Sequence, residues 1–162
     1  MYEVTQKQWA EIMGPNTVRS DVLGDDLPVT RVSDEDIQEF FARMNEKEGK
    51  KIFRLPSEAE WELAAQSPGG GWNCKDGAGV DHYDGLAEVG SLEPNQLGLY
   101  DMLGNAWEWV AADPKDPSIK GKRVRRGGSY DFTDSCKADR RSIIDPRIWD
   151  DTGFRVLREI RP

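Results

Sequence analysis

Two short motifs near the C-terminus decide the fold of this chain: RGGSY at residues 126–130 and GFR at residues 153–155. Two further motifs lie upstream, RLPSEAEWE at residues 54–62 and GNAWEW at residues 104–109. Each motif alone carries little information. Their joint order and spacing along one chain are what make the combination specific.

The N-terminal half of the chain predicts three helices, each opened by a capping residue. Thr5 begins the first as part of a capping box, and Gly14 ends its apolar spacing. Ser33 caps the second, and Gly49 lies just beyond its end. Ser57 opens the third. We expect the apolar stripes of these helices to face the core.

The C-terminal half predicts short strands separated by irregular chain. Residues 107–110 alternate in hydrophobicity and predict one strand, and residues 154–158 predict another. Helices followed by irregular chain and short strands indicate the α+β class, because strands and helices do not alternate. A length of 162 residues suits one domain, so we expect a single α+β domain over residues 1–162.

The chain is acidic, with a formal net charge of −8, and the acidic excess lies in residues 1–120. This charge argues against a general affinity for nucleic acid. The arginines of residues 121–162 are spaced singly among glycine and aromatic residues, which favours partly buried ion pairs. No apolar run approaches the roughly 20 residues of a membrane helix, so we expect no membrane span.

Taken together, the four motifs resemble those of the formylglycine-generating-enzyme (sulfatase-modifying factor) family. The resemblance runs from YEVT at residues 2–5 to GFR at residues 153–155, which is nearly the whole chain. It implies a C-type-lectin-like fold with two to three helices, short antiparallel strands and much irregular loop.

The resemblance also implies where catalytic residues would lie, and they are missing. The family's oxidases hold copper through two cysteines five residues apart, just after the RGGS segment, because Cu(I) prefers thiolates. Here Cys136 is alone in that loop, with Asp131 and Arg141 five residues to either side. A second branch uses iron held by three histidines, and this chain has only His82. We therefore predict a protein that is not an enzyme and has no catalytic residues.

The two cysteines, Cys74 and Cys136, lie far apart in the sequence. They could form one disulfide, but free thiols are the default interpretation. Cys74 follows the third predicted helix and is not expected to replace a missing copper ligand.

The resemblance implies a calcium site in the segment from Tyr100 to Trp109, while no cofactor is required. Loop carbonyls and carboxylates are the oxygen ligands that calcium prefers. The alternative is that Glu108 pairs with an arginine such as Arg126, with no metal. The implied ligands are the side chains of Asp101 and Glu108 and the carbonyls of Gly104 and Ala106.

The stretch between Tyr130 and Gly153 has the composition of a binding loop. Its large apolar residues come in adjacent pairs among aspartates instead of at periodic positions, a mixture typical of binding surfaces. We expect Phe132, Ile144 and Trp149 at the surface, while Ile143 and Ile148 fit packing or binding equally well. The candidate ligand-binding residues are Tyr130, Asp131, Phe132, Thr133, Asp134, Ser142, Ile143, Ile144, Asp145, Arg147, Ile148, Trp149, Asp150 and Asp151.

A further resemblance concerns residues 127–155. In the variable proteins of diversity-generating retroelements, which share this fold, the corresponding segment is rewritten at adenine positions while the scaffold stays fixed. The resemblance implies a non-enzymatic display domain whose partner is a protein or a ligand on a cell or virion surface. Two alternatives remain: a degenerate accessory or regulatory member of the family, and an oxidase whose copper is held by Cys74 and Cys136 together.

Overall fold

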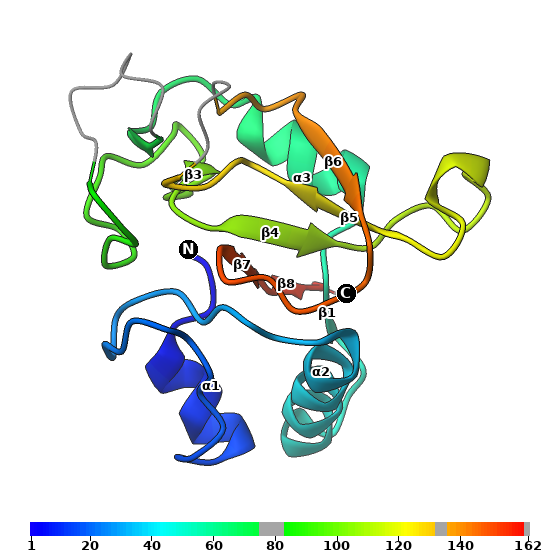
Figure 1. The fold of residues 1–162 in the computed structure, drawn as a ribbon. Helices are drawn as coiled ribbons and strands as arrows, with labels where there is room; N and C mark the ends of the chain where they lie inside the picture. Colours follow the sequence, from blue (N-terminus) through cyan, green and yellow to red (C-terminus); the bar gives the residue numbers. More distant parts are fainter. Residues whose placement is uncertain (75–82, 132–135, 161–162) are drawn as a thin grey trace.

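The structure is a computed structural model that describes residues 1–74, 83–131 and 136–160 (Figure 1). Its helices are α1 (Gln6–Met13), α2 (Asp34–Glu48) and α3 (Glu58–Ala65), with a short 3₁₀ helix at Pro117–Ile119. None of the described helices is long and apolar enough to cross a membrane. The Phe132, Thr133 and Asp134 predictions, like His82, lie outside the described residues.

All three helices begin as the capping residues predict. Thr5, Ser33 and Ser57 are the N-caps, and each accepts a hydrogen bond from the backbone N–H three residues on. In every case the side chain at that third position bonds back to the cap, which satisfies two otherwise free donors. Gly49 ends α2 in the left-handed conformation, with a φ of 69°, that a glycine adopts at little cost.

Within the described ranges, the strands form one four-stranded sheet and two pairs. The four-stranded sheet has the order β6-β5-β4-β7, in which β4 and β7 are parallel and the other pairings are antiparallel. The pairs are β1 with β8, antiparallel, and β2 with β3, parallel. The strands are β1 (Phe53–Arg54), β2 (Trp72–Asn73), β3 (Leu103–Gly104), β4 (Trp107–Val110), β5 (Arg123–Arg126), β6 (Arg141–Ile144), β7 (Thr152–Phe154) and β8 (Leu157–Arg158).

The predicted strand at 107–110 is confirmed as β4, but two other expectations are wrong in part. The final strand divides, because β7 pairs with β4 whereas β8 leaves to pair with β1. Four residues of the expected binding loop, Arg141–Ile144, form the edge strand β6 on β5. Both the division of the final strand and the formation of β6 depend on cross-strand pairing. Periodicity does not reveal such pairing in strands this short.

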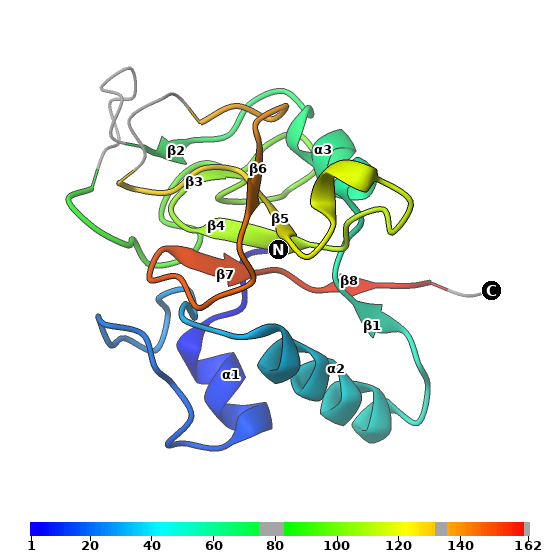
Figure 2. The same cartoon turned by 45° about the vertical axis from the view of Figure 1, so that its right-hand side comes forward.

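The sheet lies between two helical layers, with α1 and α2 on one side and α3 on the other (Figures 1 and 2). On the first side, Trp9 stacks on Phe40 at 5.3 Å between ring centroids, and Phe154 meets both rings edge-on. On the second side, Trp61 packs with Val124. The successive residues Trp109 and Val110 of β4 belong to opposite layers, as strand geometry requires.

Candidate functional site

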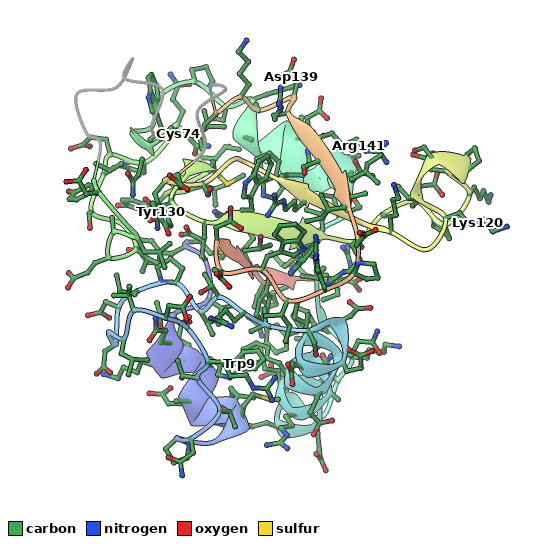
Figure 3. All side chains as sticks on the ribbon, viewed as in Figure 1. Trp9, Cys74, Lys120, Tyr130, Asp139 and Arg141 are labelled. Carbon is green, nitrogen blue, oxygen red and sulfur yellow. A yellow bond between two sulfur atoms is a disulfide. The ribbon has the colours of Figure 1, made fainter. Side chains whose placement is uncertain are left out.

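Half of the predicted binding residues line one concave pocket of about 460 Å³. Figure 3 shows one of them, Tyr130, at the end of the segment that follows β5. We call this pocket the candidate face. Its lining residues are Tyr130, Asp131, Arg147, Ile148, Trp149, Asp150 and Asp151.

The remaining described candidates lie on β6 or at its end. Ser142, Ile143 and Ile144 are half-buried, and both isoleucines pack against the core clusters. The expected surface position of Ile144 is therefore wrong. Trp149 likewise packs in part against the core, whereas Ile148 is 42% exposed and favours the binding interpretation over packing.

Arg125 on β5 contacts two lining residues of the candidate face, Asp151 and Trp149. Its guanidinium donates to Asp151 at 2.9 Å and to the Thr152 hydroxyl at 2.8 Å. The same group lies 4.6 Å from the ring centre of Trp107 and 4.9 Å from that of Trp149. One buried cation thus fixes both the acidic and the aromatic wall of the pocket. Burial lowers the pKa of Arg125, while Asp151 opposes that shift.

Sequence reasoning expected partly buried ion pairs among these arginines, and the pairs of Arg125 and Arg126 confirm it. It did not identify Arg125 as the support of the site. The available signal was the alternation of β5, RVRR, beside the tryptophans of β4. Alternation predicts that Arg123 and Arg125 share one face of the strand, but not that Arg125 pairs with Trp109 or which carboxylate lies within reach.

Backbone hydrogen bonds fix the two ends of the candidate face. The Tyr130 N–H donates to the carbonyl of Asn105 at 2.9 Å, and the Arg31 N–H donates to the carbonyl of Trp149 at 3.2 Å. Ser129 donates its hydroxyl to Asp151 at 3.1 Å. The pocket is therefore tied to the turn between β3 and β4, to the loop between α1 and α2, and to the RGGSY motif.

The pocket carries negative charge around Tyr130. Burial raises the pKa of the Tyr130 hydroxyl first, and the neighbouring carboxylates of Asp131, Asp151, Asp150 and Asp21 raise it further. Because a phenol normally loses its proton only near pH 10, Tyr130 is a neutral donor at physiological pH.

The segment predicted to bind calcium is occupied by an ion pair. Glu108 accepts hydrogen bonds from the Arg155 Nε atom and from the Trp61 indole, both at 2.6 Å. The alternative interpretation anticipated an arginine partner for Glu108, but the partner is Arg155, since Arg126 pairs with Glu62. A guanidinium in this place repels a second cation.

Two of the four implied calcium ligands already have protein partners in this structure. Asp101 accepts from the Gly90 N–H at 2.7 Å, and Glu108 is taken by Arg155. Among the described residues, no three His, Cys, Asp or Glu side chains gather in a way that could hold a metal ion. Calcium at Asp101, Gly104, Ala106 and Glu108 stays a prediction.

Glu3 is a fully buried carboxyl of the same cluster. One of its carboxylate oxygens accepts from Asn105 at 3.1 Å, and the other is buried with no hydrogen-bond partner. Burial raises the pKa of Glu3 well above its ordinary value, and the carboxylates of Asp101 and Glu108 raise it further, against the opposing charge of Arg155.

We expect Glu3→Gln to remove a pH dependence of stability. A raised folded-state pKa means that the unfolded chain releases the proton first, so stability is full below the unfolded pKa and falls as pH rises toward the folded one. Relative to the parent, Glu3→Gln should gain about 1.4 kcal/mol for each pH unit between the two pKa values. Urea unfolding from about pH 4 to about pH 8 measures this gain. A Glu3→Gln minus parent difference that stays constant with pH would contradict it.

Cys74 and Cys136 form a disulfide, with their Cα atoms 6.3 Å apart, so the default interpretation of free thiols is wrong. The bond joins the segment after β2 to the loop after RGGSY (Cys74 is labelled in Figure 3). Gly104 makes room for it, since a Cβ there would lie 2.6 Å from the Cys74 sulfur, and Gly128 makes the same allowance for Cys136. Sequence spacing could not reveal this disulfide, because it depends on the space that Gly104 and Gly128 leave beside the two sulfur atoms.

The fold and the site define an α+β domain of C-type-lectin-like type, with an irregular, pocket-forming segment in its C-terminal part. The family model described as "Sulfatase-modifying factor enzyme 1-like domain" matches residues 1–160. The chain therefore belongs to the sulfatase-modifying factor family.

Relatives within the family differ in the activity that their names state. The formylglycine-generating enzyme of Streptomyces coelicolor is 33% identical over 78% of this chain and 51% of its own length. The inactive C-alpha-formylglycine-generating enzyme 2 of Mus musculus is 32% identical over 91% of this chain and 53% of its own. The chain thus spans about half the length of these curated relatives.

A solved structure with a different name shares the fold. The protein named Treponema denticola variable protein 1 superposes with a TM-score of 0.76, covering 97% of this chain and 82% of its own. At 24% sequence identity the likeness shows the fold alone.

Proposed function

We propose that this chain is a non-catalytic, ligand-binding display domain whose contact surface is the candidate face. The observation that carries the non-catalytic part of the proposal is that Cys136 is the one cysteine in the loop after RGGS and is bonded to Cys74, which lies after β2. The family's oxidases, as the resemblance implies, need two thiols close together in the loop after RGGS. This chain offers no free thiol there, and its one histidine cannot supply a three-histidine iron site.

The architecture of the candidate face supports binding. Its exposed side chains, Asp131, Arg147, Ile148 and Asp150, project from a segment whose backbone is fixed at both ends. Beneath them lie Arg125 and other buried groups that hold the segment. A surface of changeable residues on a fixed frame can accept new contacts without loss of the fold, because exposed substitutions usually change stability by less than about 0.5 kcal/mol.

The separation of exposed lining residues from buried supporting residues also supports diversification of residues 127–155. The protein named variable protein 1 shares the fold, which makes the retroelement interpretation a coherent proposal for this chain. The DNA flanking this locus tests it. A neighbouring near-copy of codons 127–155 that differs at adenines is the expected finding, with the differences falling on exposed residues. A locus with no such copy contradicts diversification and favours an accessory or regulatory member.

A library experiment tests display itself. We expect a library randomised at Asp131, Arg147, Ile148 and Asp150 to stay folded and to yield specific binders to a test protein such as lysozyme. A matched library randomised at the supporting residues Arg125, Asp151 and Thr152 should mostly fail to fold, because it leaves buried polar groups without partners. Equal loss of folding in both libraries would contradict the proposal.

One observation supports the oxidase alternative and another argues against it. The structure does bring Cys74 and Cys136 together, as that alternative requires. Cys74, however, is 1% exposed, and the backbone at Gly104 closes directly over its sulfur. Cys136 is half-buried, so after reduction Cys74 alone would be shielded from a substrate cysteine. A copper site that needs both sulfurs is therefore less well supported than a structural bridge.

A further inference from the structure

A groove of about 830 Å³ runs along α2, away from the candidate face. One wall is α2, and the other consists of β1, the ends of β4 and β5, and part of the loop that joins them (Figure 1). α2 lines the groove from Asp34 to Gly49, a length of about 22 Å at 1.5 Å per residue. Within the described residues, the groove shares no lining residue with the candidate face.

The lining of this groove is mostly apolar. Small side chains line both walls, with the exposed Ala42 on α2 and Ala111 and Ala112 after β4, and they leave space between the walls. Clefts of about 300–1,000 Å³ with apolar linings and few polar groups are typical of small-molecule sites. The larger apolar lining residues are Ile37, Phe41, Phe53, Leu55, Val110 and Val124.

The groove is too narrow for a helix of a partner protein. A volume of about 830 Å³ over a length of about 22 Å gives a mean cross-section of about 38 Å², or a width of about 6 Å. An α-helix with its side chains is about 10–12 Å across. An extended alkyl chain fits a groove of this width, whereas a helix does not.

A partner strand does not suit the groove either, because the backbone beside it already has hydrogen-bond partners. The Asn45 side chain accepts from the N–H groups of Ile52 and Phe53 and donates to the Phe53 carbonyl. The Ala111 N–H donates to the Pro56 carbonyl at 2.8 Å, and its own carbonyl accepts another backbone N–H at 3.3 Å. Addition of a strand needs free backbone donors and acceptors, so recognition here falls to side chains.

The end of the groove at the C-terminus of α2 carries unpaired positive charge. Lys50 and Lys51 line it and are exposed, and neither forms an ion pair in the part of the chain that the structure describes. The lining carboxylate at this end of α2 is Glu46. Two ammonium groups against one carboxylate leave an excess of positive charge, which is complementary to an anion.

The other cations of the lining are already paired or lie at the opposite end. Arg123 pairs with Asp34 at 2.9 Å, at the N-terminus of α2. Arg54 pairs with Glu60 at 2.8 Å and with a second glutamate at 2.9 Å. Lys122 directly precedes Arg123 and so lies at the Asp34 end. The lysines after α2 are therefore the cations best placed to bind an anionic group.

We propose that this groove binds a small amphipathic anion of the fatty-carboxylate class. The alkyl chain lies along α2 in the narrow apolar part, and the carboxylate meets Lys50 and Lys51. The whole chain has a net charge of −8 and would attract a cationic amphiphile, so a preference for the anion identifies the groove. This inference goes beyond the proposed function and does not rest on it.

Calorimetric titration with decanoate, below its micelle concentration, tests the proposal. We expect saturable binding of decanoate at a single site. Decyltrimethylammonium, which has the same chain and the opposite charge, should bind about tenfold more weakly. Acetate, which lacks the chain, should not bind detectably. Absence of saturable decanoate binding would overturn the proposal, and so would equal binding of decyltrimethylammonium.

One pair of variants tests whether the alkyl chain occupies the groove. Ala42→Trp places an indole in the groove from an exposed position of α2, and it should remove detectable decanoate binding because the indole takes the space of the chain. Ala59→Trp, at an exposed position of α3, is the control and should bind as the parent does. The melting temperature of each variant shows that it is folded.

A second pair of variants tests the place of the carboxylate. Lys50→Gln/Lys51→Gln should bind decanoate about fivefold more weakly, the loss expected for two partly exposed ion pairs. Lys7→Gln/Lys115→Gln makes the same change in net charge at exposed lysines outside the groove and should have no effect. Decanoate binding that is unchanged in both Ala42→Trp and Lys50→Gln/Lys51→Gln would contradict the proposal.

The outcome is independent of the proposed function. Ile148→Asp alters the candidate face and should leave decanoate binding unchanged, because Ile148 does not line the groove. Failure of decanoate to bind would overturn this inference and leave the display proposal standing, whereas failure of the library experiment would leave this groove unaffected.

Discussion

Replacing Arg155 by methionine is expected to lower the free energy of unfolding by about 3–5 kcal/mol, because it leaves a buried carboxylate without its counter-charge. Arg155 is 6% exposed and Glu108 is 1% exposed. The guanidinium donates through its Nε atom to Glu108 at 2.6 Å and also reaches the Tyr100 carbonyl at 3.2 Å. Methionine fills similar space but donates nothing.

Urea unfolding of Arg155→Met measures this loss, with Arg158→Met as the control. Arg158 on β8 is exposed and pairs with Glu48 at 3.0 Å, a kind of pair worth about 0–1 kcal/mol. The double variant Glu108→Gln/Arg155→Met should recover part of the stability, because the uncompensated charge is gone. Equal losses for Arg155→Met and Arg158→Met would contradict the assignment of a buried ion pair.

Removal of the disulfide is expected to have an effect of similar size. The bond closes a loop with a sequence separation of 62 residues. In the chain-entropy description such a loop contributes about 4 kcal/mol, by restricting the unfolded chain. For a domain of this length, Cys74→Ser/Cys136→Ser should lower the melting temperature by about 10 °C.

Calorimetry of the oxidised and reduced parent chain provides the second arm of this test. Reduction should reproduce the loss seen in Cys74→Ser/Cys136→Ser, and the reductant should leave that double variant unchanged. A parent melting temperature that does not respond to full reduction, verified by thiol titration, would show that the bridge contributes no stability.

The helices could be predicted from sequence because their determinants are local. Thr5, Ser33 and Ser57 each bond to a residue three positions away, so the cap and its partner appear in the same short window. The strand β4 was accessible for the same reason, since its alternation is complete within four residues.

The remaining features depend on partners that are distant in the sequence. β6 is a strand because β5 lies beside it, and Ile143 and Ile144 gain burial from opposite core clusters. Arg125 supports the candidate face only because the fold carries Asp151 to within 2.9 Å of it. The pairing of Glu108 with Arg155 instead of Arg126 depends on which arginine of the fold faces inward.

For the candidate face, composition predicted part of the pocket lining but not the burial of each residue. The unusual mixture of apolar and acidic residues did locate the lining of one pocket, from Tyr130 to Asp151. It placed Ile144 at the surface and left Ile148 open, whereas Ile144 is half-buried and Ile148 is exposed. Ile144 is half-buried because it pairs with Arg123 of β5 and packs against the core.

The central claim, a family frame without the thiol pair that its oxidases use, is tested most directly by turnover. The purified chain is incubated with Cu(I), oxygen and a cysteine peptide copied from a sulfatase, beside the Streptomyces coelicolor formylglycine-generating enzyme as a positive control. Mass spectrometry then follows the peptide cysteine. We predict that this chain leaves the cysteine unchanged while the control enzyme converts it. Accumulation of the aldehyde with this chain would contradict the account.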